Sequence, residues 1–131
     1  MRYVTIVNQT TGQELARRAA VADSMWTRFL GLQGQPRLPQ GAGLVLLPCA
    51  SIHMLFMRFP IDAVFATREG RVVRIGRGLR PWISACFAPG ALYCVELPVG
   101  AAAATETGHM IAMRQIADGA TAPPASQQPS N

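Results

Sequence analysis

The amino-acid sequence predicts a mainly β fold, either a two-sheet sandwich or an irregular barrel, of seven to nine short strands with two short helices. The 131 residues include 12 glycines and 10 prolines, which suit many short elements joined by turns better than a helical bundle. The apolar segments are short and rich in β-branched and aromatic residues, which favour strands. A chain of this length fits one domain with its own core.

The N-terminal third predicts a β-hairpin followed by a helix. Residues 2–8 and 13–21 are expected to form the two strands, because a polar turn ending in glycine separates them. The Asp-Ser pair at 23–24 is a suitable N-cap for a short helix over 25–32, whose apolar residues share one face. A loop rich in proline and glycine follows over 34–43.

The more hydrophobic central part predicts most of the remaining strands. We expect strands over 44–47, 61–67, 71–75, 83–87, 92–97 and 110–116, and a further apolar stretch over 51–57. The Arg-Glu-Gly turn at 68–70 joins two of these strands into a hairpin. Residues 76–90 contain three glycines and two prolines, which predicts a long loop.

The C-terminal part predicts a second helix and a tail. Pro98 opens an alanine-rich helix over 101–106 and Gly108 ends it, since proline suits a first turn and alanine favours helix. Residues 118–131 lack aromatic and branched aliphatic side chains, so they cannot offset the entropy of ordering and are expected to be disordered. The sequence therefore predicts one globular domain over 1–117 and a disordered tail.

The hydropathy of the sequence argues against a membrane-spanning protein and favours a cytoplasmic location. Arg, Gln, Gly or Pro interrupts every apolar run, so no segment approaches the ~20 apolar residues that span a bilayer. The first nine residues contain no apolar core of signal-peptide length. We therefore expect no membrane span and a cytoplasmic protein.

The cysteines and histidines argue against a metal site. Cys49, Cys86 and Cys94 are widely spaced, with no Cys-x-x-Cys pair, and are expected to be reduced and mostly buried thiols. A disulfide between Cys86 and Cys94 is feasible across a hairpin. The two histidines, His53 and His109, are far apart in the chain. The sequence predicts neither a metal nor a cofactor.

Charge favours an anionic or protein partner over nucleic acid. The formal net charge is +5, and all twelve basic residues are arginines. Arginine recurs every third residue from Arg68 to Arg80, but the intervening glycines disfavour a helix. In a strand this spacing sends alternate side chains to opposite faces. We interpret these arginines as a solvated basic surface, which makes nucleic acid an unlikely partner and leaves an anionic ligand open.

Three sequence segments carry a family resemblance. They are Ser51-Ile52-His53 with Met57-Arg58-Phe59-Pro60-Ile61-Asp62, then Arg77-Gly78-Leu79-Arg80-Pro81-Trp82, and finally Val95-Glu96-Leu97-Pro98-Val99-Gly100. On these motifs, roughly residues 12–116 resemble the domain-of-unknown-function 192 family of small bacterial and archaeal proteins. The resemblance implies a mainly β fold of two packed sheets with short helices. It supplies no activity and no catalytic residue.

Two positions depart from the pattern of that family. Met54 follows His53 where threonine is common, which removes a hydroxyl group. His109 follows Gly108 where the family has an aspartate. This chain therefore lacks the acid that the resemblance implies at this position.

His53 and Asp62 are the candidate catalytic residues, since both lie among apolar neighbours. A buried carboxylate needs a partner, and for Asp62 this is Arg58, His53 or backbone N–H groups. If residues 51–54 and 61–64 pair as antiparallel strands, one register sets His53 opposite Asp62. An imidazole oriented by a carboxylate is part of a hydrolase-like triad, but the nucleophile is missing.

The candidate ligand-binding residues are Arg58, Arg77, Arg80, Trp82 and Glu96. Aromatic and arginine side chains on the 76–90 loop suit recognition, although Trp82 is equally suited to cover the core. Glu96 is interpreted as structural, either accepting from N–H groups of the 101–106 helix or pairing with Arg58 or Arg80.

These observations favour a non-catalytic binding or accessory module that recognises a protein, a peptide or an anionic ligand. The alternative is a hydrolase-like enzyme that uses His53 and Asp62. Binding is favoured because the sequence contains no nucleophile elbow, cofactor motif or metal-ligand constellation.

Overall fold

The computed structural model describes residues 2–22, 37–54 and 57–116, and this part of the chain contains nine strands and no helix. The strands are β1 (Tyr3–Asn8), β2 (Glu14–Ala22), β3 (Ala42–Leu46), β4 (Ser51–His53), β5 (Ile61–Ala66), β6 (Val72–Leu79), β7 (Ala85–Phe87), β8 (Tyr93–Leu97) and β9 (Ile111–Gln115). The expectation that strands dominate the fold is confirmed, and so are the two expected hairpins, with turns at 8–13 and at 67–71.

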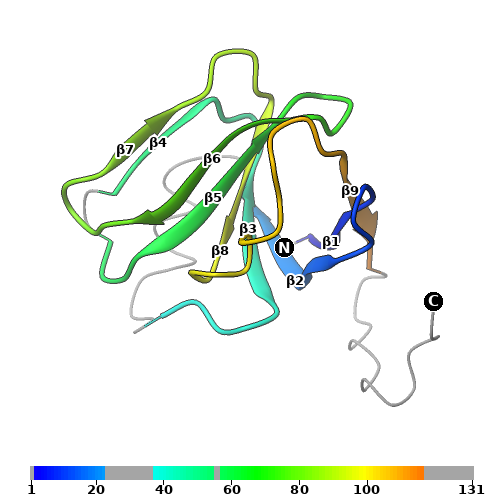
Figure 1. Cartoon of the computed structure of the whole chain (residues 1–131). Coiled ribbons are helices and arrows are strands. Elements are labelled where there is room, and N and C mark those ends of the chain that lie inside the picture. Colours follow the sequence, from blue (N-terminus) through cyan, green and yellow to red (C-terminus); the bar gives the residue numbers. More distant parts are fainter. Residues whose placement is uncertain (1, 23–36, 55–56, 117–131) are drawn as a thin grey trace.

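Seven of the strands form one sheet in the order β6-β5-β8-β3-β2-β1-β9, and β4 and β7 form a small second sheet (Figure 1). Neighbouring strands are antiparallel except β2 and β3, which are parallel. The small sheet is antiparallel, with Ile52 opposite Cys86. The fold is therefore one large sheet with a two-stranded sheet rather than two sheets of similar size.

The large sheet curls until its two edge strands approach each other at one end. Arg71, next to β6, forms a β-bridge with Met110, next to β9. Val72 N–H donates to His109 C=O and Ile111 N–H donates to Gly70 C=O, both over 2.8–2.9 Å. Because a twisted sheet coils, these contacts join its ends into a half-barrel. Of the two expected architectures, the irregular barrel is the nearer.

The two faces of the curled sheet bury two separate cores. One core includes Val45, Val64 and Val95. The other includes Leu46, Phe65 and Cys94, and it also contains Ile52 and Cys86 from the small sheet. All six residues of β5, which lies between β6 and β8, are buried, because a strand covered on both faces needs apolar side chains on both.

The helix expected over 101–106 is not formed, so that prediction was wrong. Residues 98–105, here called the 98–105 segment, make consecutive tight turns in which Ala101, Ala103 and Thr105 N–H groups donate three residues back. Gly100 has a φ of +94°, which a right-handed helix cannot contain. Ala102 and Thr105 are fully buried, so the segment packs against the core although it forms no helix.

The long loop expected over 76–90 is also partly wrong, because β6 continues to Leu79. Gly78 has a φ of +60° and lies at an irregularity in the pairing of β5 with β6. Glycine tolerates this conformation, so a residue that predicts a loop instead marks a β-bulge. The expected strand at 83–87 is shorter, as β7 starts at Ala85.

Two predicted segments, the helix over 25–32 and the tail over 118–131, lie outside the described residues.

The three cysteines are free thiols, with Cys86 and Cys94 buried and Cys49 half-buried, so no disulfide joins Cys86 to Cys94. Among the residues described, no helix is long and apolar enough to cross a membrane.

Burial of Tyr93 predicts a loss of stability in alkali. Desolvation raises the pKa of its phenol from 10.0 to about 12. The unfolded chain therefore loses this proton at lower pH than the folded chain, and stability falls as pH rises above 10. The full loss is about 2–3 kcal/mol once pH exceeds the folded pKa. Urea unfolding between pH 9 and 12 checks this.

The matched control is Tyr93→Phe, which removes the titrating group and keeps the ring. Its free energy of unfolding should fall less steeply than that of the parent protein between pH 10 and 12. If the free energy of unfolding falls equally with pH in both proteins, groups other than Tyr93 cause the loss of stability in alkali.

Candidate functional site

Asp62 lies at the start of β5, where its buried carboxylate accepts hydrogen bonds from three backbone N–H groups. The residue is 2% exposed. Oδ1 accepts from Gly78 N–H at 2.9 Å, and Oδ2 accepts from Gly100 N–H at 2.9 Å and Ala102 N–H at 3.2 Å. Of the three partners predicted for this carboxylate, backbone N–H groups are the correct one.

Arg77 holds the same segment through its carbonyl groups. Its Nη2 donates to Ala102 C=O at 3.4 Å and also to Thr105 C=O. Asp62 thus binds N–H groups of the 98–105 segment while Arg77 binds its C=O groups. The three motifs that carry the family resemblance therefore meet here, and the contacts among them fix the fold.

The predicted pairing of His53 with Asp62 is wrong. The strand that carries His53, β4, pairs with β7, and His53 lies opposite Ala85. The strand that carries Asp62, β5, pairs with β6 and β8, and Asp62 lies opposite Leu97. The two residues are therefore in different sheets, because β4 and β5 do not form the hairpin that their closeness in sequence favours.

Glu96 points to the face of the large sheet opposite to Asp62. It is fully buried in β8, where it lies between Leu44 of β3 and Ala63 of β5. Side chains alternate along a strand, so Ala63 and Glu96 share one face while Asp62 and Leu97 share the other. Glu96 was predicted to accept from N–H groups of the 101–106 helix or to pair with Arg58 or Arg80, but within this segment the N–H group of Ala102 donates to Asp62 instead.

The small sheet presents an exposed apolar face, here called the β4–β7 surface. Burial alternates as exposed, buried, exposed along both strands. Ile52 and Cys86 face the core, so Ser51, His53, Ala85 and Phe87 face outward. We include in this surface the adjoining turn residues Trp82 and Ile83. Trp82 is 55% exposed, Ile83 70% and Phe87 65%.

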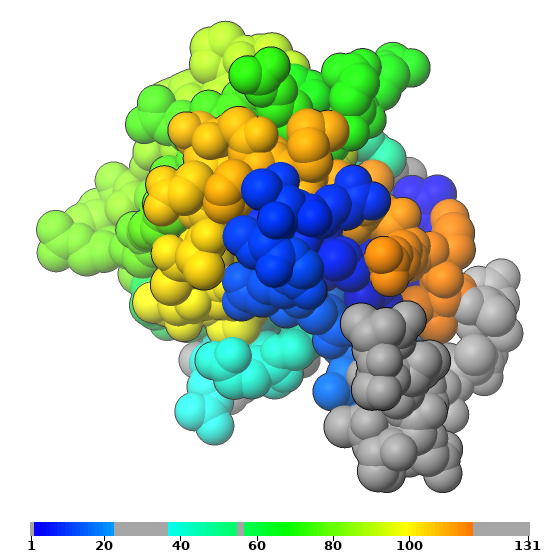
Figure 2. All heavy atoms as spheres, turned by 45° about the vertical axis from the view of Figure 1, so that its right-hand side comes forward, coloured from blue at the N-terminus to red at the C-terminus, as the bar shows by residue number. Residues whose placement is uncertain are grey.

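The turn that carries Trp82 is held by backbone hydrogen bonds to the end of β4. Trp82 N–H donates to Met54 C=O at 2.7 Å, and Met54 N–H donates to Ser84 C=O at 2.9 Å. Trp82 has a φ of 70°, a left-handed conformation that is rare for a residue with a large side chain. The yellow-green chain near residue 80 projects at the left of Figures 1 and 2.

The structure thus separates the predicted site residues into groups. His53 and Trp82 both belong to the β4–β7 surface, and Arg80 is exposed at the start of the turn. Arg58 is exposed in the segment before β5. Asp62 and Arg77 hold the 98–105 segment, and Glu96 is in the core. In the described ranges, no three His, Cys, Asp or Glu side chains are grouped as metal ligands would be.

His109, at the position that departs from the family pattern, accepts hydrogen bonds through its ring. Glu106 N–H donates to His109 Nδ1 at 3.2 Å, and Asn8 Nδ2 lies 3.2 Å from the same nitrogen. The Asn8 side chain is fully buried and also donates to Thr105 Oγ1. Acting as the acceptor of both bonds, Nδ1 of His109 links the backbone at Glu106 to the buried Asn8 side chain. Figure 2 shows this orange segment against the blue β1–β2 hairpin.

Sequence reasoning missed a groove beside β1 and β2 that contains Arg17 and Arg18. The groove brings together residues from positions 3, 17, 18, 20 and 40–43. No local pattern could reveal it, because the parallel pairing of β2 with β3 decides which of these residues are neighbours. The adjacent arginines in a strand were the one available signal.

Comparison with known proteins places the chain in a family. The family model described as "DUF192: Uncharacterized ACR, COG1430" matches residues 6–113. A "UPF0127 protein" of Thermococcus sibiricus is 37% identical over 100 residues, which are 72% of this chain and 64% of that protein. The chain therefore aligns with less than two thirds of that relative. A "UPF0127 protein" of Pyrococcus furiosus is 36% identical over 100 residues, 72% of this chain and 84% of that protein.

A solved structure shares the fold. It is the crystal structure of a protein of unknown function from Novosphingobium aromaticivorans, with a TM-score of 0.67 and 24% identity, covering 84% of this chain and 83% of that one. The family match over most of the described residues agrees with the resemblance carried by the three motifs. The chain therefore belongs to the DUF192 family of uncharacterised proteins.

Proposed function

We propose that this protein is a non-catalytic binding module whose β4–β7 surface recognises an apolar segment of a partner protein. The observation that carries the proposal is the exposure of three large apolar side chains, Trp82, Ile83 and Phe87, within six consecutive residues. Each apolar side chain that faces water costs free energy. A group of them on one part of a surface is therefore characteristic of an interaction site.

The preformed turn supports a binding role. Its hydrogen bonds to Met54 hold the backbone on both sides of Trp82, and Arg80 N–H also donates to Ser84 Oγ at 2.9 Å. A surface that is ordered before binding loses less conformational entropy in the complex. The left-handed conformation of Trp82 is the kind of backbone strain that proteins retain at functional positions.

Charge complementarity defines the partner further. Residues 51–53 and 80–87 contain no acidic side chain but include His53 and Arg80, and the chain carries a net charge of +5. Tryptophan and arginine are the residues that contribute most at protein interfaces. The matching segment therefore combines large apolar residues with aspartate or glutamate.

The positions of the candidate catalytic residues support binding over hydrolysis. Asp62 is occupied by three backbone N–H groups, and His53 is exposed on a different sheet. The Asp62 carboxylate therefore holds the backbone and does not orient His53, as a hydrolase-like dyad would require.

Selection of random linear peptides against the intact chain tests the proposal. The selected peptides should carry apolar residues flanked by acidic ones. Trp82→Ala should weaken their binding about thirtyfold, because truncating a central tryptophan costs about 2 kcal/mol. Isothermal titration with a selected peptide measures the change.

Val99→Ala is the matched control, because Val99 is also an exposed apolar residue (49%) but lies in the 98–105 segment. Its affinity should stay within twofold of the parent. Peptides that bind Trp82→Ala and Val99→Ala equally well would contradict the proposal. A dimer that Trp82→Ala dissociates would identify a second copy of the chain as the partner instead.

A further inference from the structure

A groove lies on the large sheet, over β1, β2 and the residues that lead into β3. Its volume is about 640 Å³, and its walls include Tyr3, Arg17, Arg18, Ala20 and Gln40 with residues 41–43. A volume between about 300 and 1,000 Å³ is typical of small-molecule sites. None of these residues belongs to the β4–β7 surface. We propose that the groove binds a small molecule that carries a phosphate or carboxylate group.

Arg18 supplies the principal contact for the anion. Its guanidinium carbon lies 3.9 Å from the centroid of the Tyr3 ring, so the group is held by a cation–π contact. That contact uses no N–H donor. No hydrogen bond or ion pair to the Arg18 side chain is found in residues 2–22, 37–54 and 57–116. A guanidinium fixed in this way can bind a phosphate or carboxylate through two parallel hydrogen bonds.

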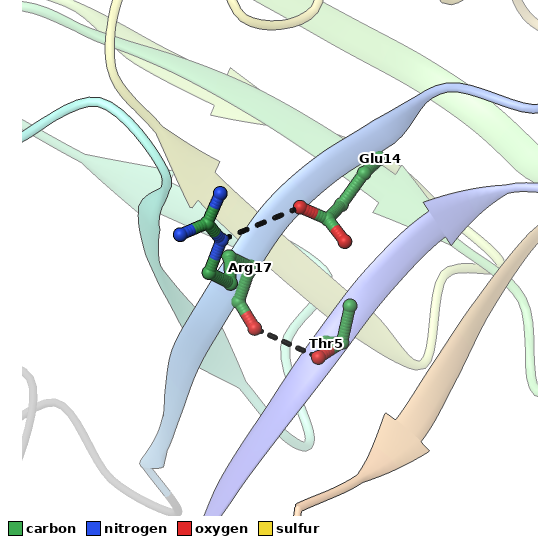
Figure 3. A network of polar contacts seen from close by, with 3 residues as sticks. All are labelled: Thr5, Glu14 and Arg17. Carbon is green, nitrogen blue, oxygen red and sulfur yellow. Dashed lines mark hydrogen bonds and ion pairs between the residues drawn. The ribbon is translucent and has the colours of Figure 1, made fainter. Parts of the chain in front are cut away.

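Arg17 supplies a second positive charge. Its Nε lies 3.9 Å from Glu14 Oε1 (Figure 3), and the two side chains are 43% and 44% exposed. An ion pair this long and exposed is weak. Although the side chain is half-exposed, its Nε atom is shielded from water and makes no hydrogen bond with the described residues, so this atom has no close partner. An anion in the groove therefore competes with a weak internal contact.

The remaining lining suits an apolar body next to the anionic group. Ala20 and Ala42 have small apolar side chains, and they lie on the paired strands β2 and β3. Gly41 has a φ of +83°, and a Cβ there would meet nothing within 4 Å. The small side chains leave room for a ring or short alkyl group, while the positive net charge raises the local concentration of anions.

Titration of the ¹⁵N-labelled full-length chain with phenyl phosphate, inorganic phosphate, benzoate and phenol tests this inference. Phenyl phosphate should shift the amide signals of Gly41 and Gly43, and phenol should not. Arg18→Gln should weaken phenyl phosphate binding about tenfold or more, because it removes a bidentate charged contact. Glu14→Gln should strengthen binding a few-fold, because it removes the acidic competitor for Arg17.

Arg74→Gln is the matched control, since Arg74 is exposed on the edge strand β6, which three other strands separate from β2, and its loss changes the net charge equally. Binding within twofold of the parent supports a specific site. Equal weakening by Arg74→Gln and Arg18→Gln would overturn the inference, and so would equal binding of phenol. If Arg18→Gln does not fold, Arg17→Gln tests the same prediction with a several-fold loss. Binding of phenyl phosphate but not benzoate would identify phosphate as the group, and the reverse a carboxylate.

Discussion

Replacing Asp62 with alanine is expected to destabilise the protein by about 3–5 kcal/mol, because removing a buried acceptor leaves its donors unsatisfied. Three backbone N–H groups, from Gly78, Gly100 and Ala102, then lose their acceptor inside the fold. Hydrogen bonds to a charged group are also stronger than neutral ones. Urea unfolding followed by circular dichroism measures the change.

Two variants make the Asp62 result specific. Asp62→Asn keeps one acceptor oxygen but directs an NH₂ group at a backbone N–H, so its loss should be intermediate. Glu69→Ala removes an exposed carboxylate from the β5–β6 turn and should change stability by less than about 0.5 kcal/mol. A loss below about 1 kcal/mol for Asp62→Ala would show that water replaces the carboxylate.

Gly70→Ala is expected to cost a similar amount, about 3–5 kcal/mol, because it combines backbone strain with a steric clash. Gly70 has a φ of +96°, and a Cβ there would lie 2.1 Å from the backbone oxygen of Ile111. That oxygen cannot move alone, since Ile111 N–H donates to Gly70 C=O in the same contact. The substitution therefore opens the junction between the two edges of the half-barrel. Thermal and urea unfolding measure the loss.

Gly12→Ala separates the two causes. Gly12 also has a positive φ, +81°, but a Cβ there would meet nothing within 4 Å. Its cost should be only the left-handed conformation, about 1–2 kcal/mol. Equal losses at Gly12 and Gly70 would mean that the edge junction contributes little.

The Asp62 prediction gives the family's motifs a structural role. Asp62 and Gly100 come from different motifs that are far apart in sequence, yet they meet in one hydrogen bond of 2.9 Å. Arg77 joins them by binding Ala102 and Thr105. The residues that make these contacts hold the backbone, so recognition is better sought at exposed positions that make none of them, such as Trp82, Phe87 and Arg18.

The sequence by itself determined most of the strands. Alternating or continuous apolar residues bounded by turn residues are local signals, and they located β1, β2, β5 and β8 to within about two residues. The turn at 67–71 is also local, because glycine supplies the left-handed conformation at its tight end. Reduced, buried cysteines followed from composition and spacing alone.

Only the tertiary structure decided which strands pair and what the polar residues contact. β4 pairs with β7, more than thirty residues away, and not with the nearby β5. That choice depends on burying Ile52 and Cys86 together in one core, a non-local gain that no sequence window contains. It moves His53 away from Asp62 and onto an exposed surface. In the same way, the parallel pairing of β2 with β3 brings Arg18 opposite Ala42 and so forms the groove.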